Sequence, residues 1–399
     1  TRMFARITHT LGKTQSENDK STSLFKNTFY TIQAGYTHYT EKQQDEINKE
    51  NVFNYGYVGK FKTYKARKYK LVNDTLGNPL HYISITGNYD TLVTFDPSVS
   101  ANPEASNYTS QYYDLFPGDP KKVDDITSGL GLLNGSATSN PYNLWYNTGS
   151  KVLNRYYNKE ENQKRITGMF STDIKNHSIQ IGFEYEQRED RNWSIRPSSI
   201  WGLMRSYETV TLNTNDSSIH YGPIVLENGD ILQNPTYPVW QNDYMVANAS
   251  QFDKSLRDKL KIGNGQWIDI DNLDPSTFSI SMFAPDELLN NSNLLFGYYG
   301  YSYDNRKVSA KEKFTFDALN NFYKAKDDNG NYKRIVPAFQ PLYTSGYIQD
   351  KFDIKDLKFN IGLRIDYFDA QQPVLKDKYL MREAFTAGED KKFQHPTNI

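Results

Sequence analysis

The sequence contains no cysteine and no long apolar run, and each absence limits what the chain can be. Without cysteine, the 399 residues include neither a disulfide nor a thiolate metal site, which is compatible with the cytosol and equally with an oxidising cell envelope. No apolar run approaches the ~20 residues that a transmembrane helix needs. The first residues, TRMFARITHT, lack the basic-then-apolar order of a signal peptide. Helical membrane spans are therefore not expected, whereas strands remain able to span a membrane.

Enzyme motifs are also missing. The six histidines form no HExxH pair, GLGLLNG has the wrong glycine spacing for a dinucleotide site, and no GxSxG segment occurs. We therefore expect no enzymatic activity and no cofactor. Calcium in the loops is a minor alternative, because residues 269–274 and 327–331 offer oxygen ligands without completing a calcium-binding loop.

Neither positive nor negative charge is in excess, since the net charge is −1. Only one basic cluster stands out, YKARKYK at residues 64–70. Contact with lipopolysaccharide phosphates or an anionic ligand is one interpretation of this cluster. A solvated strand face is the favoured one, because no second basic block joins it. No nucleic acid partner is expected.

The residues that are abundant favour strands and long loops. The chain has 31 Tyr, 22 Phe and 24 Gly, and its apolar residues mostly alternate with polar ones. In LKFNIGLRIDYFD, residues 357–369, each odd position up to Tyr367 is apolar and the even positions between are polar or Gly. A period of two indicates a β-strand that lies between two different environments. The sequence therefore predicts an all-β, antiparallel chain.

Three segments repeat one template: IQAGYTHY (32–39), IQIGFEYE (179–186) and FNIGLRID (359–366). Each places glycine fourth, on the polar face, where it is expected to leave room in a crowded interior. These glycines are Gly35, Gly182 and Gly362.

The connections between the predicted strands are very unequal in length. Lys175 and Asn176 form one predicted two-residue turn, and Lys355 and Asp356 form another. On the other side lie two long loops, at about 42–163 and 188–340. Short turns on one side, long loops on the other, and strands of about 9–11 residues are typical of an outer-membrane β-barrel. The alternative is a soluble β-sandwich, which has shorter strands and more frequent turns.

The barrel interpretation assigns each strand residue to lipid or to the lumen. A charge that faced the bilayer centre would cost about 2–4 kcal/mol, so charged residues must point inward. The predicted lipid-facing residues are Ile179, Ile181, Phe183, Phe359, Ile361, Leu363 and Ile365. The predicted lumen-facing residues are Gln180, Glu184, Glu186, Arg364 and Asp366.

The hairpin TSGYIQDKFDIKDLKFNIGLRIDYFDAQQPVLKD resembles those of TonB-dependent outer-membrane receptors, in particular the large receptors of Bacteroidetes. FYTIQAGYTHY, NYGYVGKFKTY and FAPDELLNNSNLLFGYYGYSYDN agree with it. The resemblance implies a plugged barrel of about 22 strands, of which this chain shows about six. Residues 1–399 are then a fragment of the barrel domain, and the plug domain is not among them.

The resemblance also implies a function and partners. It implies a location in the cell outer membrane, contact with its lipid, and uptake of an unknown nutrient driven by the TonB complex through the missing plug. A surface lipoprotein is a further optional partner. Other functions stay open: a soluble or surface β-rich carbohydrate-binding protein or glycoside hydrolase, or a barrel used for secretion or anchoring.

In the barrel interpretation the long loops carry ligand recognition. The tryptophans in or beside them are weak candidate ligand contacts, although packing inside the loops is the favoured role: Trp145, Trp193, Trp201, Trp240 and Trp267. The loops also show local structure. Helices are predicted at 250–260 and 285–296, and hairpin turns at Asn228-Gly229 and Asn329-Gly330.

Overall fold

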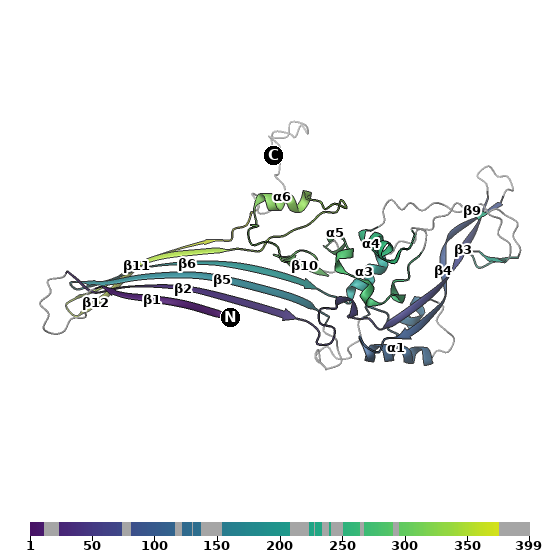
Figure 1. The fold of residues 1–399 in the computed structure, drawn as a ribbon, viewed down its shortest axis with the longest axis horizontal. Helices are drawn as coiled ribbons and strands as arrows, with labels where there is room; N and C mark the ends of the chain where they lie inside the picture. Colours follow the sequence, from purple (N-terminus) through teal and green to yellow (C-terminus); the bar gives the residue numbers. More distant parts are fainter. Residues whose placement is uncertain are drawn as a thin grey trace, which may run out of the picture.

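A long curved sheet and a folded unit of loops at one end of it make up the molecule in the computed structural model (Figure 1). The structure describes residues 1–11, 24–73, 81–115, 122–129, 131–136, 154–207, 223–226, 228–233, 239–240, 250–263, 267–289 and 295–374. For residues 71–73, 81–88 and 239–240 it describes the backbone alone.

The main sheet is an antiparallel meander in which most neighbours in the sequence are neighbours in space. Its order is β1 (Arg2–Leu11), β2 (Phe25–Gln43), β5 (Tyr156–Ile174), β6 (His177–Ile195), β11 (Leu342–Ile354) and β12 (Leu357–Asp369). The short β10 (Phe296–Tyr299) pairs with the far end of β6. The expected mostly β, antiparallel architecture is confirmed, and these strands form an open sheet with β1 and β12 at its edges.

Both predicted hairpins are present, with turns at Lys175-Asn176 and Lys355-Asp356. Lys175 and Lys355 have φ angles of 54° and 55°. A positive φ in a two-residue turn matches the twist of the strands that it joins. No helix in the parts of the chain that the structure describes is long and apolar enough to cross a membrane.

The strands are longer than the alternation of apolar residues predicted. β2, β5 and β6 have 19 residues each, so they extend into segments that the sequence assigned to loops. Polar residues continue the ladder there, as in the pairs Glu41↔Lys159 and Glu161↔Asp190. Backbone pairing does not need an apolar face, so the end of the hydrophobic pattern does not mark the end of the strand.

The register places apolar and polar residues on opposite faces, because directly paired residues in antiparallel strands share a face. One row across the sheet is Ile7, Ile32, Gly168, Phe183, Gly346 and Ile365. The adjacent row on the other face is Arg6, Gln33, Thr167, Glu184, Ser345 and Asp366. The seven residues predicted to face lipid share the first face, and the five predicted to face the lumen share the second.

The loop unit contains helices, a three-stranded sheet of order β3-β4-β9 and a two-stranded sheet of β7 and β8. Its strands are β3 (Gly59–Asn73), β4 (His81–Pro97), β7 (Ile224–Val225), β8 (Ile231–Leu232) and β9 (Val239–Trp240). Its helices are α1 (Pro103–Leu115), α2 (Val123–Ser128), α3 (Ser199–Tyr207), α4 (Gln251–Leu260), α5 (Pro285–Leu289) and α6 (Phe316–Lys324), with short 3₁₀ turns η1 (Val52–Asn54), η3 (Ile270–Asn272), η4 (Pro275–Thr277) and η5 (Ile280–Met282).

The larger core joins the loop unit to the sheet. Tyr156 and Trp193, at the ends of β5 and β6, are buried in it together with Trp201 of α3 and Phe252 of α4. The smaller core packs β3 and β4 against α1 and α2 around Phe61. Fully burying one such aromatic side chain contributes about 1.5–3 kcal/mol, so these clusters give the loops a fixed shape.

The local predictions in the loops are confirmed in three cases of four. α4 begins after Ser250, whose hydroxyl accepts a hydrogen bond from the backbone N–H of Asp253. The two Asn-Gly turns form, with φ of 91° at Gly229 and 83° at Gly330. Of the helix predicted at 285–296 the structure describes α5, Pro285–Leu289; residues 290–294 lie outside the described residues, and Phe296 belongs to β10 instead.

The three template glycines differ in what lies over them. A Cβ at Gly182 would lie 2.4 Å from the Tyr347 ring, because that ring covers the glycine from the next strand. At Gly362 it would meet the Ile348 carbonyl oxygen at 3.1 Å, whereas at Gly35 the nearest atom is 3.8 Å away. The expectation of a crowded polar face therefore holds at Gly182 and Gly362 and not at Gly35.

Gly182→Ala should lower the free energy of unfolding by about 1 kcal/mol, because the new methyl group displaces the Tyr347 ring. Gly35→Ala is the matched control and should change it by less than about 0.5 kcal/mol. Denaturant unfolding of the intact protein in detergent measures both. Equal effects of the two substitutions would contradict the packing described here.

Candidate functional site

The apolar face of the main sheet is exposed to an unusual extent. The side chains of Ile361, Leu363 and Ile365 on β12 are 60%, 63% and 67% exposed, and Phe183 on β6 is 52% exposed. The same face exposes Ile7, Ile32, Ile166, Ile181, Ile348 and Phe359. Soluble monomers rarely leave contiguous apolar patches larger than a few hundred Å² uncovered, so a face of this size marks a site of interaction.

Charged residues border this apolar face, and one pair, His177 and Asp350, lies within it, because Asp350 is directly opposite Ile179 and Ile361. At the loop end, the first charged residues of β5 and β12 on this face are Lys164 and Asp369. Asp350 accepts a hydrogen bond from the His177 ring at 2.6 Å through one of its two carboxylate oxygens. On the apolar face of β12 the uncharged positions run from Leu357 to Tyr367, which is ~33 Å at the rise of a β-strand and matches the length of a tilted membrane-spanning strand.

The opposite face carries a network of paired polar groups. The Arg364 guanidinium donates to the Tyr343 hydroxyl at 2.7 Å, to the Ser345 hydroxyl at 3.0 Å and to the Asp366 carboxylate at 2.9 Å. Arg165 and Glu184 form an ion pair at 2.6 Å on neighbouring strands. Charges in such a network are compatible with a hydrated space and not with hydrocarbon.

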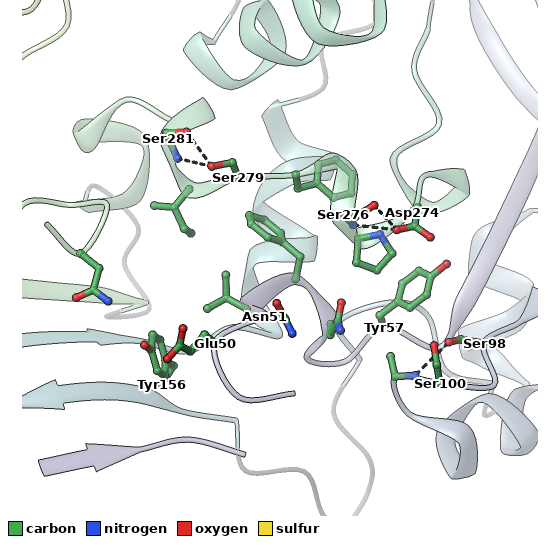
Figure 2. Close-up of a pocket in the computed structure, with 18 of the residues that line it drawn as sticks. Glu50, Asn51, Tyr57, Ser98, Ser100, Tyr156, Asp274, Ser276, Ser279 and Ser281 are labelled. Carbon is green, nitrogen blue, oxygen red and sulfur yellow. Dashed lines mark hydrogen bonds between the residues drawn. The ribbon is translucent and has the colours of Figure 1, made fainter. Parts of the chain in front are cut away.

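A broad hollow of about 990 Å³ lies in the loop unit, close to the ends of β5 and β6. Figure 2 shows its two sides: Asp274, Ser276, Ser279 and Ser281 on one, and Glu50, Asn51, Tyr57, Ser98, Ser100 and Tyr156 on the other. Turns η4 and η5 form the first side, and η1 with the segment after β4 forms the second.

The lining offers hydroxyls, carboxylates and aromatic rings. Asp274 accepts from the Ser276 backbone N–H at 2.9 Å and from its hydroxyl at 2.6 Å, and these bonds hold the pKa of Asp274 below 3.8. Tyr57 stacks on Trp201 at 5.5 Å, and burial raises the pKa of Tyr57 to about 12. At neutral pH the hollow therefore presents an anion and a neutral phenol, a set that suits a hydroxyl-rich ligand.

A buried polar network next to the hollow holds the segments that form its wall in place. Asn134, which is fully buried, donates to the Gly59 carbonyl at 2.9 Å and to the Asp271 carboxylate at 3.1 Å. Arg205 of α3 binds both oxygens of Asp271, at 2.6 and 2.9 Å. The network therefore ties the base of β3, α3 and η3 together, and η3 leads directly into the side of the hollow.

The tryptophans fall into different environments. Trp201 is fully buried, with its Nε1 donating to the Phe53 carbonyl at 3.2 Å, so it packs the interior. Trp193 is also buried and contributes to the lining of the hollow. Trp267 is half-buried, with the Lys65 Nζ 4.3 Å from its ring centre. Trp145 and the side chain of Trp240 lie outside the described residues.

Sequence reasoning missed the serines and Asp274 of the hollow. In residues 274–281, Asp274 and Ser279 each precede a short 3₁₀ turn and accept from a backbone N–H two residues later. Their spacing is a signal for turns, and nothing in it pointed to a cavity.

The acidic stretches considered for calcium are engaged within the protein. Asp271 pairs with Arg205, and Asp327 accepts from the backbone N–H groups of Asn329 and Asn331. Among the residues with described positions, no group of three His, Asp or Glu side chains is placed to hold a metal ion. The described residues of these two segments form no such group of ligands, and calcium binding there stays a prediction.

Asp271→Ala should lower the free energy of unfolding of the loop unit by about 2 kcal/mol, because it leaves Arg205 and Asn134 without their shared acceptor. This expected loss is smaller than that for a fully buried ion pair because Arg205 is partly exposed. Asp274→Ala is the control and should cost less than about 1 kcal/mol, since its bonds are local. Hydrogen exchange of α3 measures both, and equal protection in the two variants would contradict the assignment.

Comparisons with known proteins leave the family open. No family model, no curated protein and no solved structure matches the chain. The resemblance of the hairpin at 344–377 to TonB-dependent receptors is therefore a prediction from its residues, and function has to be argued from the geometry.

Proposed function

We propose that this chain forms part of the wall and the surface loops of an outer-membrane β-barrel receptor that binds and imports a nutrient. The observation that carries the proposal is the main sheet, which exposes a largely apolar face on one side, with the His177–Asp350 pair as its charged exception, and a paired polar network on the other. Lipid would cover the first face and the lumen would hydrate the second.

The exposed apolar face favours this function over a soluble sandwich. In a sandwich, a second layer of protein buries the apolar face at a distance of about 10 Å. Here Phe359, Ile361 and Leu363 are 38%, 60% and 63% exposed, so no described segment covers them. A chain with this face in water would aggregate, whereas a bilayer makes the same residues stabilising.

The proposal requires that the two edge strands of the sheet be paired with further strands. In hydrocarbon every backbone N–H and C=O has to be paired, so a spanning sheet has to close on itself. β1 and β12 each have one neighbour among the described strands. Further strands of the same receptor would therefore pair with β1 and with β12 to complete the barrel.

The loop unit would be the part that meets the nutrient outside the cell. Its hollow combines hydroxyls, carboxylates and aromatic rings on a rigid support, which is suited to recognition of a polar ligand. The TonB complex, the plug and a surface lipoprotein enter the proposal from the resemblance of the hairpin alone. A carbohydrate-binding protein or glycoside hydrolase could use the same hollow, and what separates the two functions is the apolar face.

Leu363→Arg should sharply reduce assembly of the intact receptor in the outer membrane, because its neighbour across the strands is the apolar Ile348 and an arginine that faced the bilayer centre would cost about 2–4 kcal/mol. Asn360→Arg, three residues away on the polar face, is the control and should assemble nearly as well as the parent. Heat-modifiable migration of outer-membrane fractions measures assembly. Equal tolerance at both positions would remove the two-environment argument.

The absence of cysteine allows a direct test of which face meets lipid. A fluorophore on Leu363→Cys should be quenched by spin-labelled lipid, and one on Asn360→Cys should not. Quenching of both positions by aqueous iodide, with no effect of the lipid quencher, would overturn the membrane assignment and favour the soluble alternative.

A further inference from the structure

Strand β3 carries an unusual concentration of positive charge. Its 15 residues include no acidic side chain and six basic ones: Lys60, Lys62, Lys65, Arg67, Lys68 and Lys70. It pairs with β4 to form a twisted ribbon that extends from the loop unit away from the main sheet (Figure 1). The basic cluster seen in the sequence is therefore part of a projecting element.

The two faces of β3 differ in their surroundings. On the odd-numbered face, Phe61, Thr63 and Tyr69 are buried, and Lys65 forms an ion pair with Asp90 at 2.7 Å. On the even-numbered face, Lys62, Tyr64 and Lys70 are exposed and Lys60 and Lys68 are half-exposed. Lys65 and Arg67 are also exposed on the odd-numbered face, but buried side chains lie on both sides of them, whereas the even-numbered face is accessible along its whole length.

The positive charges on the open face are not compensated locally. Asp96 lies opposite Lys60, whereas Lys62, Lys68 and Lys70 lie opposite Thr94, Gly87 and Ser84. None of these last three lysines forms an ion pair with a residue that the structure describes. A solvated strand face in a chain of net charge −1 would ordinarily mix both signs, so the missing acidic neighbours need a reason.

We propose that the even-numbered face of β3 from Lys60 to Lys70, the cationic strip, binds an extended anionic polysaccharide that carries carboxylate or sulfate groups. Side chains two residues apart in a strand are ~6.7 Å apart, so the strip is one residue wide and ~33 Å long. Those dimensions match a linear polymer with regularly repeated charges better than the broad surface of a folded protein.

The exposed tyrosine also fits a sugar chain. Tyr64 lies between Lys62 and Lys68 on the open face, and the Lys62 Nζ is 4.9 Å from its ring centre. An aromatic ring beside a cation offers a sugar both a flat apolar surface and a charge partner. Nucleic acids are less well matched, because single strands need several stacking rings and duplexes are bound by domains that are basic overall.

This inference goes beyond the proposed function and stands on the charges of the ribbon alone. The strip also differs from the hollow, although Lys60 belongs to both. The lining of the hollow includes four carboxylates, Glu50, Asp96, Asp274 and Asp304, against Lys60 and Arg306. An anionic polymer would therefore be attracted to the strip and repelled by the hollow.

The test is the affinity of the intact protein for heparin and polygalacturonate at low salt, with neutral dextran for comparison. Lys62→Gln with Lys70→Gln should weaken binding of at least one polyanion about fivefold to tenfold, and binding should weaken further as salt screens the charges. Lys313→Gln with Lys324→Gln is the matched control, because it removes the same charge from exposed positions beside and in α6. The control should change affinity less than twofold.

Three results would overturn the proposal: no salt-sensitive binding of either polyanion, equal losses in the two double variants, or single-stranded DNA bound as tightly as the polysaccharides. The substituted lysines are exposed, so far-UV circular dichroism should show both variants folded like the parent. The lipid-quenching result at Leu363 is independent of this binding, so failure of one proposal is distinguishable from failure of the other.

Discussion

The central constraint on this structure is that a single layer of strands carries a largely apolar exposed face on one side and a polar face on the other. A β-strand sends successive side chains to opposite faces, so one face can be wholly apolar only if the register is kept across every strand. Here the register is kept from β1 to β12 except at one irregularity between Lys26 and Phe29, near the start of β2. A slip of one residue in any strand would place charges such as Glu184 or Arg364 among the exposed isoleucines. The paired charges of the polar face oppose such a slip because each has a partner on its own face.

The loop unit depends on the sheet for its position and on its own cores for its shape. The ends of β5 and β6 supply Tyr156 and Trp193 to the larger core, so the first layer of the loop unit is built on the sheet. Arg191 strengthens this joint, because its guanidinium, which is buried, donates to the Gly300 and Val308 carbonyls at 3.0 and 2.8 Å. Binding residues in loops need such support, since a flexible loop loses entropy when it orders around a ligand.

Much of the sheet could be predicted from the sequence, and much of the hollow could not. The period of two, the two-residue turns and the template strands predicted the hairpins and the residues that share each face, because these are local properties of the chain. The true ends of β5 and β6 were missed, since polar residues there are paired only through tertiary context. The hollow brings together segments around 50, 98 and 276, and no local pattern encodes which distant turns will meet. The covering of Gly182 by Tyr347 has the same origin, because the ring comes from a strand 165 residues later.

The 19-residue length of β6 has a consequence for the reach of the molecule. Its exposed apolar positions end at Tyr185, and the strand continues to Ile195, which adds ~33 Å of paired backbone at the rise of a β-strand. If the apolar part lies in the bilayer, this paired extension is a rigid support that holds the hollow and the β3–β4 ribbon above the lipid headgroups. A stiff, hydrogen-bonded support of that height would let the binding surfaces meet bulky molecules that cannot approach the lipid itself.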